Sequence, residues 1–139
     1  MADAVVTRII DLPRQLTVHL ACLSDGTGES AVTKVTRANY LDPNGVVPTN
    51  LKLVSARWCI QGFSSISILW KHTANDTAMI LSGSGYDTFN PQLSAPTRGL
   101  ADPNTSGDTV TSTIGDVLLT SRGAAANASY DITLVYDKT

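Results

Sequence analysis

The sequence predicts an all-β protein, an antiparallel β-sandwich of jelly-roll or immunoglobulin-like type with about eight or nine strands. Short stretches of alternating apolar and polar residues recur along the chain, separated by turns rich in Gly, Pro, Asn and Asp. No long window repeats apolar residues at helical spacing, which disfavours a parallel sheet with crossover helices. Charged residues make up only 16% of the chain, and Ser, Thr, Asn and Gly supply much of the polarity, as is typical of β-rich proteins.

The 139 residues suit one domain, expected to span residues 15–139. Residues 1–14 are assigned to an N-terminal arm or an edge strand. The run from Val5 to Leu12 is apolar and precedes Pro13, and the adjacent Ile9 and Ile10 break a clean alternation. An edge strand would belong to the chain's own sheet, whereas an arm would add a strand to the sheet of a neighbour.

Three strands are predicted in the first half of the domain. Residues 15–23 alternate between an apolar and a more polar face, and residues 31–36 follow a turn at residues 25–28, so these two segments are expected to form a hairpin. After a turn at residues 42–45, residues 51–60 form the most regular strand. One face of that strand is expected to carry Val54, Ala56, Trp58 and Ile60.

The second half is predicted to contain strands at residues 65–70, 78–81 and 116–120, with a short one at 109–113. A long loop is expected at about residues 82–109, which are rich in Gly, Pro, Ser, Asn and Thr. A loop of this length is usually functional or held by a partner. Residues 130–136 alternate cleanly and predict a half-buried strand.

No catalytic residue, cofactor site or metal site is predicted. His19 lies on the more polar face of its strand and His72 in a turn, and neither has a nucleophile and an orienting group in a recognisable pattern. Asp76, Asp102 and other carboxylates at loops and strand ends are interpreted as solvated turn residues, because they lack the spacing of a calcium loop.

Cysteines and aromatic residues are assigned to packing. Cys22 and Cys59 are expected to be two buried free thiols, with a disulfide between neighbouring strands as the alternative. Most of the tryptophans and tyrosines fall at alternating strand positions, where core packing is the usual role of an aromatic ring. The alternative for them is a platform that stacks sugar rings.

Charge and hydropathy exclude some partners. The net charge is −2, and the ten Lys and Arg residues are scattered, so binding to nucleic acid is not expected. No apolar run is long enough to span a membrane, and no signal peptide is expected at the N-terminus. Synthesis in a host cytoplasm is the corresponding prediction.

Five short segments resemble the small virion structural proteins of tailed bacteriophages, including those of cyanophages. They are residues 25–35 (DGTGESAVTKV), 66–70 (ISILW), 80–85 (ILSGSG), 115–120 (GDVLLT) and 130–134 (YDITL). The resemblance extends over about residues 16–138 and consists of turns and strands. It implies a β-sandwich that decorates or cements the outer surface of a capsid, as a dimer or trimer across contacts of the major capsid protein.

The resemblance also fits a small tail or baseplate component, and a carbohydrate-binding sandwich is the other alternative. A protein of this kind is expected to be non-enzymatic and to act through its N-terminal run and its long loop. The predicted partner contacts are the apolar residues of these two segments: Val5, Val6, Ile9, Ile10, Leu12, Tyr86, Phe89, Leu93 and Leu100.

Overall fold

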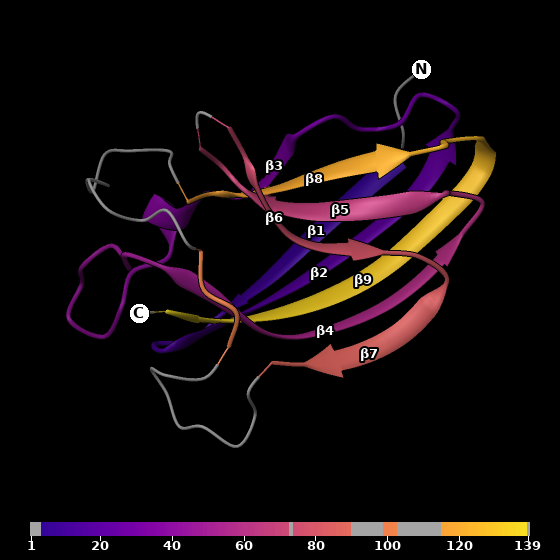
Figure 1. Cartoon of the computed structure of the whole chain (residues 1–139). Coiled ribbons are helices and arrows are strands. Elements are labelled where there is room, and N and C mark those ends of the chain that lie inside the picture. Colours follow the sequence, from indigo (N-terminus) through magenta and orange to yellow (C-terminus); the bar gives the residue numbers. More distant parts are fainter. Residues whose placement is uncertain (1–3, 73, 90–98, 103–114, 139) are drawn as a thin grey trace.

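The computed structural model describes residues 4–72, 74–89, 99–102 and 115–138, and it confirms an antiparallel all-β sandwich (Figure 1). The elements are β1 (Ala4–Asp11), β2 (Gln15–Asp25), β3 (Val32–Val35), the 3-10 helix η1 (Arg37–Asn39), β4 (Leu51–Gln61), β5 (Ser65–Trp70), β6 (Asp76–Leu81), β7 (Ser84–Thr88), β8 (Val117–Arg122) and β9 (Ala126–Lys138). Among the described residues no helix has the length and apolar character needed to span a bilayer.

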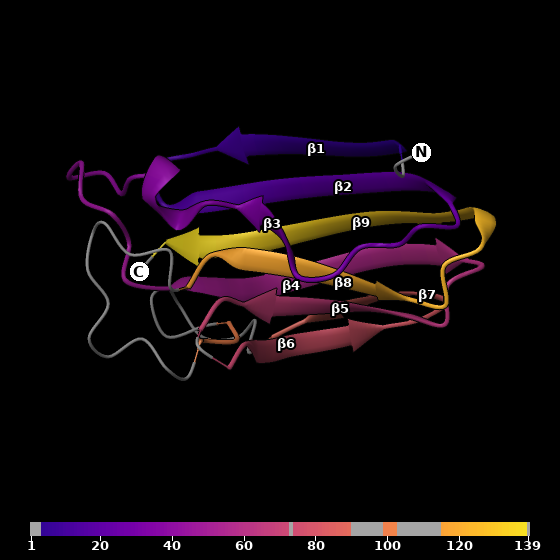
Figure 2. The ribbon, with the colours of Figure 1, turned by 90° about the horizontal axis from the view of Figure 1, so that it is seen from above.

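The strands form two sheets. One sheet has five strands in the order β1-β2-β9-β4-β7, and the other has four in the order β3-β8-β5-β6. In Figure 2, β1 is the outermost strand and β2 lies next to it. β9 pairs with both β2 and β4 and therefore occupies the centre of the larger sheet.

Alternation along the strands builds the core between the sheets. β2 and β9 turn every second side chain inward, and these side chains are buried. From the facing sheet, Ile66, Ile68 and Leu119 are fully buried against them. Burial of this apolar surface is the main force holding the layers together.

The buried face of β4 differs from the prediction because the strand carries an irregularity. Its register with β9 shifts between Leu53 and Ser55. Leu51 and Leu53 are buried before the shift, and Ala56 and Ile60 after it. An extra residue in one strand exchanges the faces of all residues that follow, so the simple alternation that placed Val54 on one face with Ala56 and Ile60 was wrong there.

The predicted hairpin between residues 15–23 and 31–36 is also wrong. β2 pairs with β1 and β9, whereas β3 pairs with β8 in the other sheet. The chain crosses between the layers at this point, through the Gly26 and Gly28 turn, in which both glycines have positive φ. Turn residues predict a change of direction, but they do not distinguish a hairpin from a crossing between sheets.

The predicted long loop contains a strand. β7 spans Ser84–Thr88 and pairs with β4 at the edge of the larger sheet. A Cβ placed on Gly85 would lie 2.7 Å from the Trp58 ring, so the glycine lets that ring pack against the strand backbone. The remainder of the predicted loop, and the predicted strand at 109–113, lie largely or wholly outside the described residues.

Asp116 is buried rather than solvated. Its Oδ1 accepts a hydrogen bond of 2.8 Å from the backbone N–H of Arg37. Burial raises the pKa of this carboxyl above its ordinary value. The loss of hydration outweighs the Arg37 hydrogen bond and the attraction of the charges on Arg37 and Lys71.

Asp116→Asn is therefore expected to gain stability relative to the parent chain as pH rises above about 4. The native carboxyl keeps its proton to a higher pH than the unfolded one. The unfolded state thus binds fewer protons in this interval, and Asp116 makes the parent chain less stable as pH rises through the raised pKa. Urea unfolding of both chains between pH 4 and pH 7 measures the effect; a difference that does not change with pH would contradict it.

Candidate contact surfaces and a histidine–carboxylate cluster

β1 is an edge strand with a regular, open side. It pairs with β2 without interruption, from Ala4 opposite Leu23 to Asp11 opposite Leu16. Among the described residues, no strand pairs with its other side. Natural edge strands are commonly short, bulged or protected by charge. β1 runs for eight residues without a bulge, and Arg8 is the one charged side chain between its ends, so its outer side has the form of a template for a further strand.

Apolar side chains are exposed on both faces of β1. Val6 and Ile10 point to the outer face of the sheet and are 43% and 60% exposed. Val5, on the inner face, is 37% exposed, while Ile9 is half-buried against the core. Leu12 follows the strand and is exposed. The smaller sheet therefore leaves most of β1 uncovered, and the predicted N-terminal contact residues are largely available to a partner.

The C-terminal end of β1 is fixed to the rest of the fold by a buried lysine. Nζ of Lys138 pairs with the Asp11 carboxylate and donates hydrogen bonds to the carbonyl oxygens of Leu12 (2.7 Å) and Leu41 (2.8 Å). A hydrogen-bonded ammonium in this position couples β1 to β9 and to the segment that precedes β4. The apolar edge is thereby held in place before any partner binds.

The predicted contacts from the second segment are divided. Tyr86 is 61% exposed and lies over the Arg57 guanidinium, with the Arg57 Cζ atom 5.5 Å from the ring centroid. Phe89 and Leu100 are half-buried and pack against the core, so they present less surface to a partner than Tyr86 does. Leu93 lies outside the described residues.

Tyr86 and Arg57 border a shallow open pocket on the outer face of the larger sheet. The pocket has a volume of about 270 Å³, and Thr133 and Val135 of β9 line it with them. His19, further along this face, lies 2.8 Å from Oδ1 of Asp131. Trp70, Tyr130 and Tyr136 are buried in the core and are not available to a ligand, whereas Trp58 is half-buried and lines a neighbouring pocket with Arg57.

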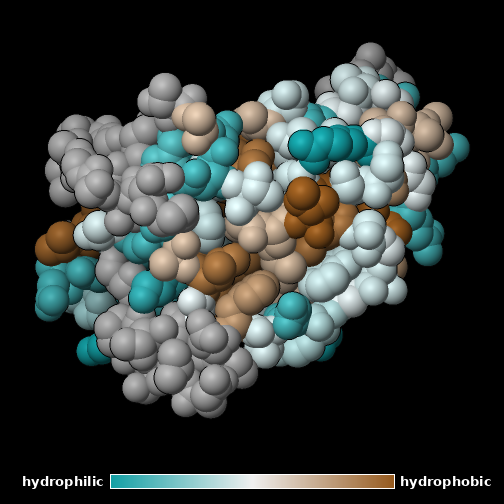
Figure 3. Space-filling model, viewed as in Figure 1, coloured by the Kyte–Doolittle hydropathy of each residue, from teal (hydrophilic) through white to brown (hydrophobic). Residues whose placement is uncertain are grey.

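The face of the smaller sheet is mixed in character. Figure 3 shows apolar side chains scattered among polar ones on this side of the molecule. Of the described residues in this sheet, the large apolar side chains exposed are Val32 and Ile80. They lie on the two edge strands, β3 and β6, so they form no continuous patch comparable to β1.

Neither cysteine forms a disulfide, and only Cys22 is buried. Cys59 is exposed, so its predicted burial was wrong. Cys22 of β2 pairs with Tyr130 of β9, and Cys59 of β4 pairs with Asp131 of β9. Tyr130 and Asp131 are neighbours along β9, so their side chains, and those of the paired cysteines, point to opposite faces of the sheet. The sheet therefore separates the two thiols, and this arrangement does not permit a disulfide between them.

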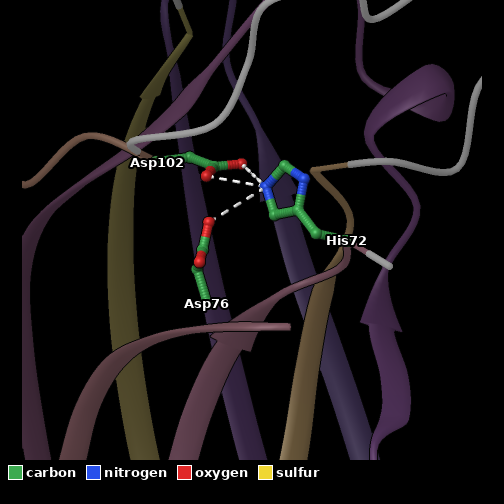
Figure 4. A group of neighbouring side chains, drawn as sticks. All are labelled: His72, Asp76 and Asp102. Carbon is green, nitrogen blue, oxygen red and sulfur yellow. Dashed lines mark hydrogen bonds and ion pairs between the residues drawn. The ribbon is translucent and has the colours of Figure 1, made fainter. Parts of the chain in front are cut away.

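A compact histidine–carboxylate cluster lies at one end of the sandwich (Figure 4). Nε2 of His72 is 2.7 Å from each carboxylate oxygen of Asp102 and 3.4 Å from Oδ2 of Asp76. The Asp102 side chain is only 1% exposed. The prediction of solvated turn residues was therefore wrong for Asp102.

Hydrogen bonds to the backbone hold two members of this cluster, His72 and Asp102. The N–H of His72 donates to Oδ1 of Asn75 at 3.0 Å, which closes the turn before β6. Asp102 exchanges two hydrogen bonds of 3.3 Å with the side chain of Asn50. Two backbone hydrogen bonds between Leu100 and Leu53, of 2.7 and 2.9 Å, attach this segment to β4.

The sequence gives only a partial signal for the cluster. His72 and Asp76 are four residues apart, but Asp102 follows from a distant part of the chain. Nε2 of His72 faces the carboxyl groups of Asp102 and Asp76. This set of atoms can share a proton or hold a cation.

No protein-family model, curated protein or solved structure matches the chain. The surfaces of the fold are therefore the basis on which a function can be proposed.

Proposed function

We propose that this chain is a non-enzymatic virion structural protein that binds the outer surface of a capsid and cements contacts of the major capsid protein. The observation that carries the proposal is the open edge of β1, with its exposed apolar side chains on both faces. A strand added at that edge would gain backbone hydrogen bonds and would cover Val6 and Ile10. The likeness of five segments to virion proteins of tailed phages supports the same proposal.

The geometry also suits a repetitive partner. A capsid offers many copies of one binding site, so modest affinity at each site is reinforced when a dimer or trimer engages several at once. Edge pairing supplies such a contact without a deep pocket, because backbone groups provide most of the hydrogen bonds. The proposed location of the protein is the capsid surface, after synthesis in the host cytoplasm.

The variant Val6→Lys/Ile10→Lys tests the role of β1. Both side chains are exposed, so the fold should tolerate the change, while two ammonium groups at the edge oppose addition of a strand. We expect co-sedimentation with capsids that lack the protein to fall by about tenfold or more. We also expect these capsids to be stabilised against heat by the parent chain but not by the variant.

Ile80→Lys is the matched control, because Ile80 is 63% exposed on an edge strand of the other sheet. It should bind as the parent chain does. Normal binding by the β1 variant, together with loss of binding by the Ile80 variant, would place the contact elsewhere. If the parent chain does not co-sediment with capsids, the capsid role itself is wrong; imaging the virion then tests a tail or baseplate location.

The exposed Tyr86 beside Arg57 favours one second candidate, a carbohydrate-binding module. An exposed aromatic ring next to an open pocket is a common element of sugar recognition, but a single ring provides a small platform. Tyr86→Ala should abolish glycan binding under this candidate, whereas Val6→Lys/Ile10→Lys, at the opposite edge of the larger sheet, should leave glycan binding unchanged.

A further inference from the structure

We propose that His72, Asp76 and Asp102 form a binding site for a divalent transition-metal ion, with Zn²⁺ the best match. The three side chains offer one imidazole nitrogen and two carboxylate groups, whose ligand atoms lie within 4.8 Å of one another. Figure 4 shows both carboxylates directed at the same edge of the imidazole ring. This inference does not depend on the proposed binding to a capsid.

The spacing of the ligand atoms is close to that of a bound ion. Metal–ligand bonds of about 2.0–2.1 Å in tetrahedral geometry place neighbouring ligand atoms about 3.3 Å apart. Oδ2 of Asp76 is already 3.4 Å from Nε2 of His72. The Asp102 oxygens, at 2.7 Å, would have to move away by roughly 0.6 Å to admit the ion between them and the ring.

The chemistry of the donors favours a transition metal over calcium or magnesium. Imidazole nitrogen is a preferred ligand of zinc, nickel and copper, whereas calcium and magnesium prefer oxygen alone. The two carboxylates supply negative charge in a place where water has little access, since the side chains of His72 and Asp102 are 10% and 1% exposed. Low access to water strengthens the attraction between these carboxylates and a cation.

The site is also held in position before an ion arrives. Asn50 holds the backbone of Asp102 and Asn75 holds the backbone of His72, so these two ligands start from anchored backbone positions. Coordination requires the lone pair of Nε2. If Nε2 carries a proton before binding, that proton is released to solvent when the ion binds. If the ring carries its single proton on Nδ1, Nε2 can bind the ion directly.

A bound ion would join three segments of the fold. His72 follows β5, Asp76 begins β6, and Asp102 belongs to the connection between β7 and β8. The three protein ligands leave at least one coordination position for water or for a ligand from another molecule. The ion would thus stabilise this end of the sandwich against unfolding.

The test is a titration of the chelator-treated full chain with Zn²⁺. Calorimetry measures binding, and thermal unfolding measures the change in Tm. We expect saturable binding of a single ion per chain and a rise in Tm of roughly 5–10 °C when free Zn²⁺ is about 100 times Kd. His72→Gln should abolish both effects. Asp76→Asn leaves the His72–Asp102 pair in place, so it should fold normally and bind Zn²⁺ at least tenfold more weakly.

His19→Gln is the matched control. His19 pairs with Asp131 at a similar distance of 2.8 Å, on the outer face of the larger sheet. This variant should bind Zn²⁺ as the parent chain does. The proposal fails if the parent chain shows no saturable binding, if the affinity is the same in the Asp76 variant, or if the His19 variant alone loses binding. If the parent chain shows no saturable binding, His72 and Asp102 form a hydrogen-bonded pair with a structural role.

Discussion

Replacing Lys34 by methionine is expected to lower the free energy of unfolding by about 3–5 kcal/mol. Nζ of Lys34 lies 2.5 Å from Oε2 of Glu29, and the two side chains are 4% and 8% exposed. The other oxygen of Glu29 accepts a hydrogen bond of 2.5 Å from the Tyr130 hydroxyl. Without the ammonium, a carboxylate stays buried with its charge uncompensated, and this is the main source of the loss.

The double variant Lys34→Met/Glu29→Gln provides the control. It removes both charges, so it should recover a substantial part of the lost stability, while the amide oxygen can still accept from Tyr130. Burial raises the pKa of Tyr130, and its hydrogen bond to Glu29 raises it further, so the phenol stays a donor. Urea unfolding measures all the variants. A loss below about 0.5 kcal/mol for Lys34→Met would contradict a buried ion pair.

Trp70→Ala is expected to cost about 3–5 kcal/mol of stability. Trp70 is buried in β5 of the smaller sheet, and its Nε1–H donates to the carbonyl oxygen of Leu51 in β4 of the larger sheet at 3.1 Å. The substitution leaves a cavity between the layers and an unsatisfied carbonyl. Unfolding in urea, followed by circular dichroism, would measure the loss.

Trp58 supplies a matched comparison for this prediction. Its Nε1–H also donates to a carbonyl oxygen, that of Ser82 at 3.0 Å, but the ring is only half-buried at the sheet edge. Trp70→Phe should cost about 1–2 kcal/mol for the lost hydrogen bond, and Trp58→Phe less. If Trp58→Ala lowered the free energy of unfolding as much as Trp70→Ala does, the contact that Trp70 makes between the sheets would not be the source of the larger loss.

Most of the fold could be predicted from the sequence because the hydrophobic alternation of a sandwich is local. The segments at 65–70 and 130–136 lie in β5 and β9. β9 begins earlier than predicted, and its first residues were missed because Ala126–Ser129 carry little apolar signal. The partners of a strand are not local. The crossing between β2 and β3 was missed because the same turn residues serve a hairpin and a change of sheet.

The buried polar groups could not be predicted for a related reason. Lys34, Arg37 and Asp102 belong to residue types that are normally solvated. Each is buried beside a partner that the topology supplies: Glu29, the Pro48 carbonyl oxygen and His72, respectively. Spacing along the chain indicates His72 with Asp76, but the third member of that cluster depends on how the connection after β7 returns to β4.

The central position of β9 has a consequence for the order of folding. In the larger sheet, β9 is the strand that joins β2 to β4, although it begins 101 residues after β2 ends and 65 residues after β4 ends. Before β9 is in place, this sheet consists of two separate ribbons, β1-β2 and β4-β7, and a ribbon of two strands is only marginally stable in water. Strand pairs between distant parts of a chain form slowly. Until they form, the unpaired strand edges are prone to associate with other chains. During synthesis, the nascent chain is thus most exposed to mispairing in the interval before residues 126–138 emerge.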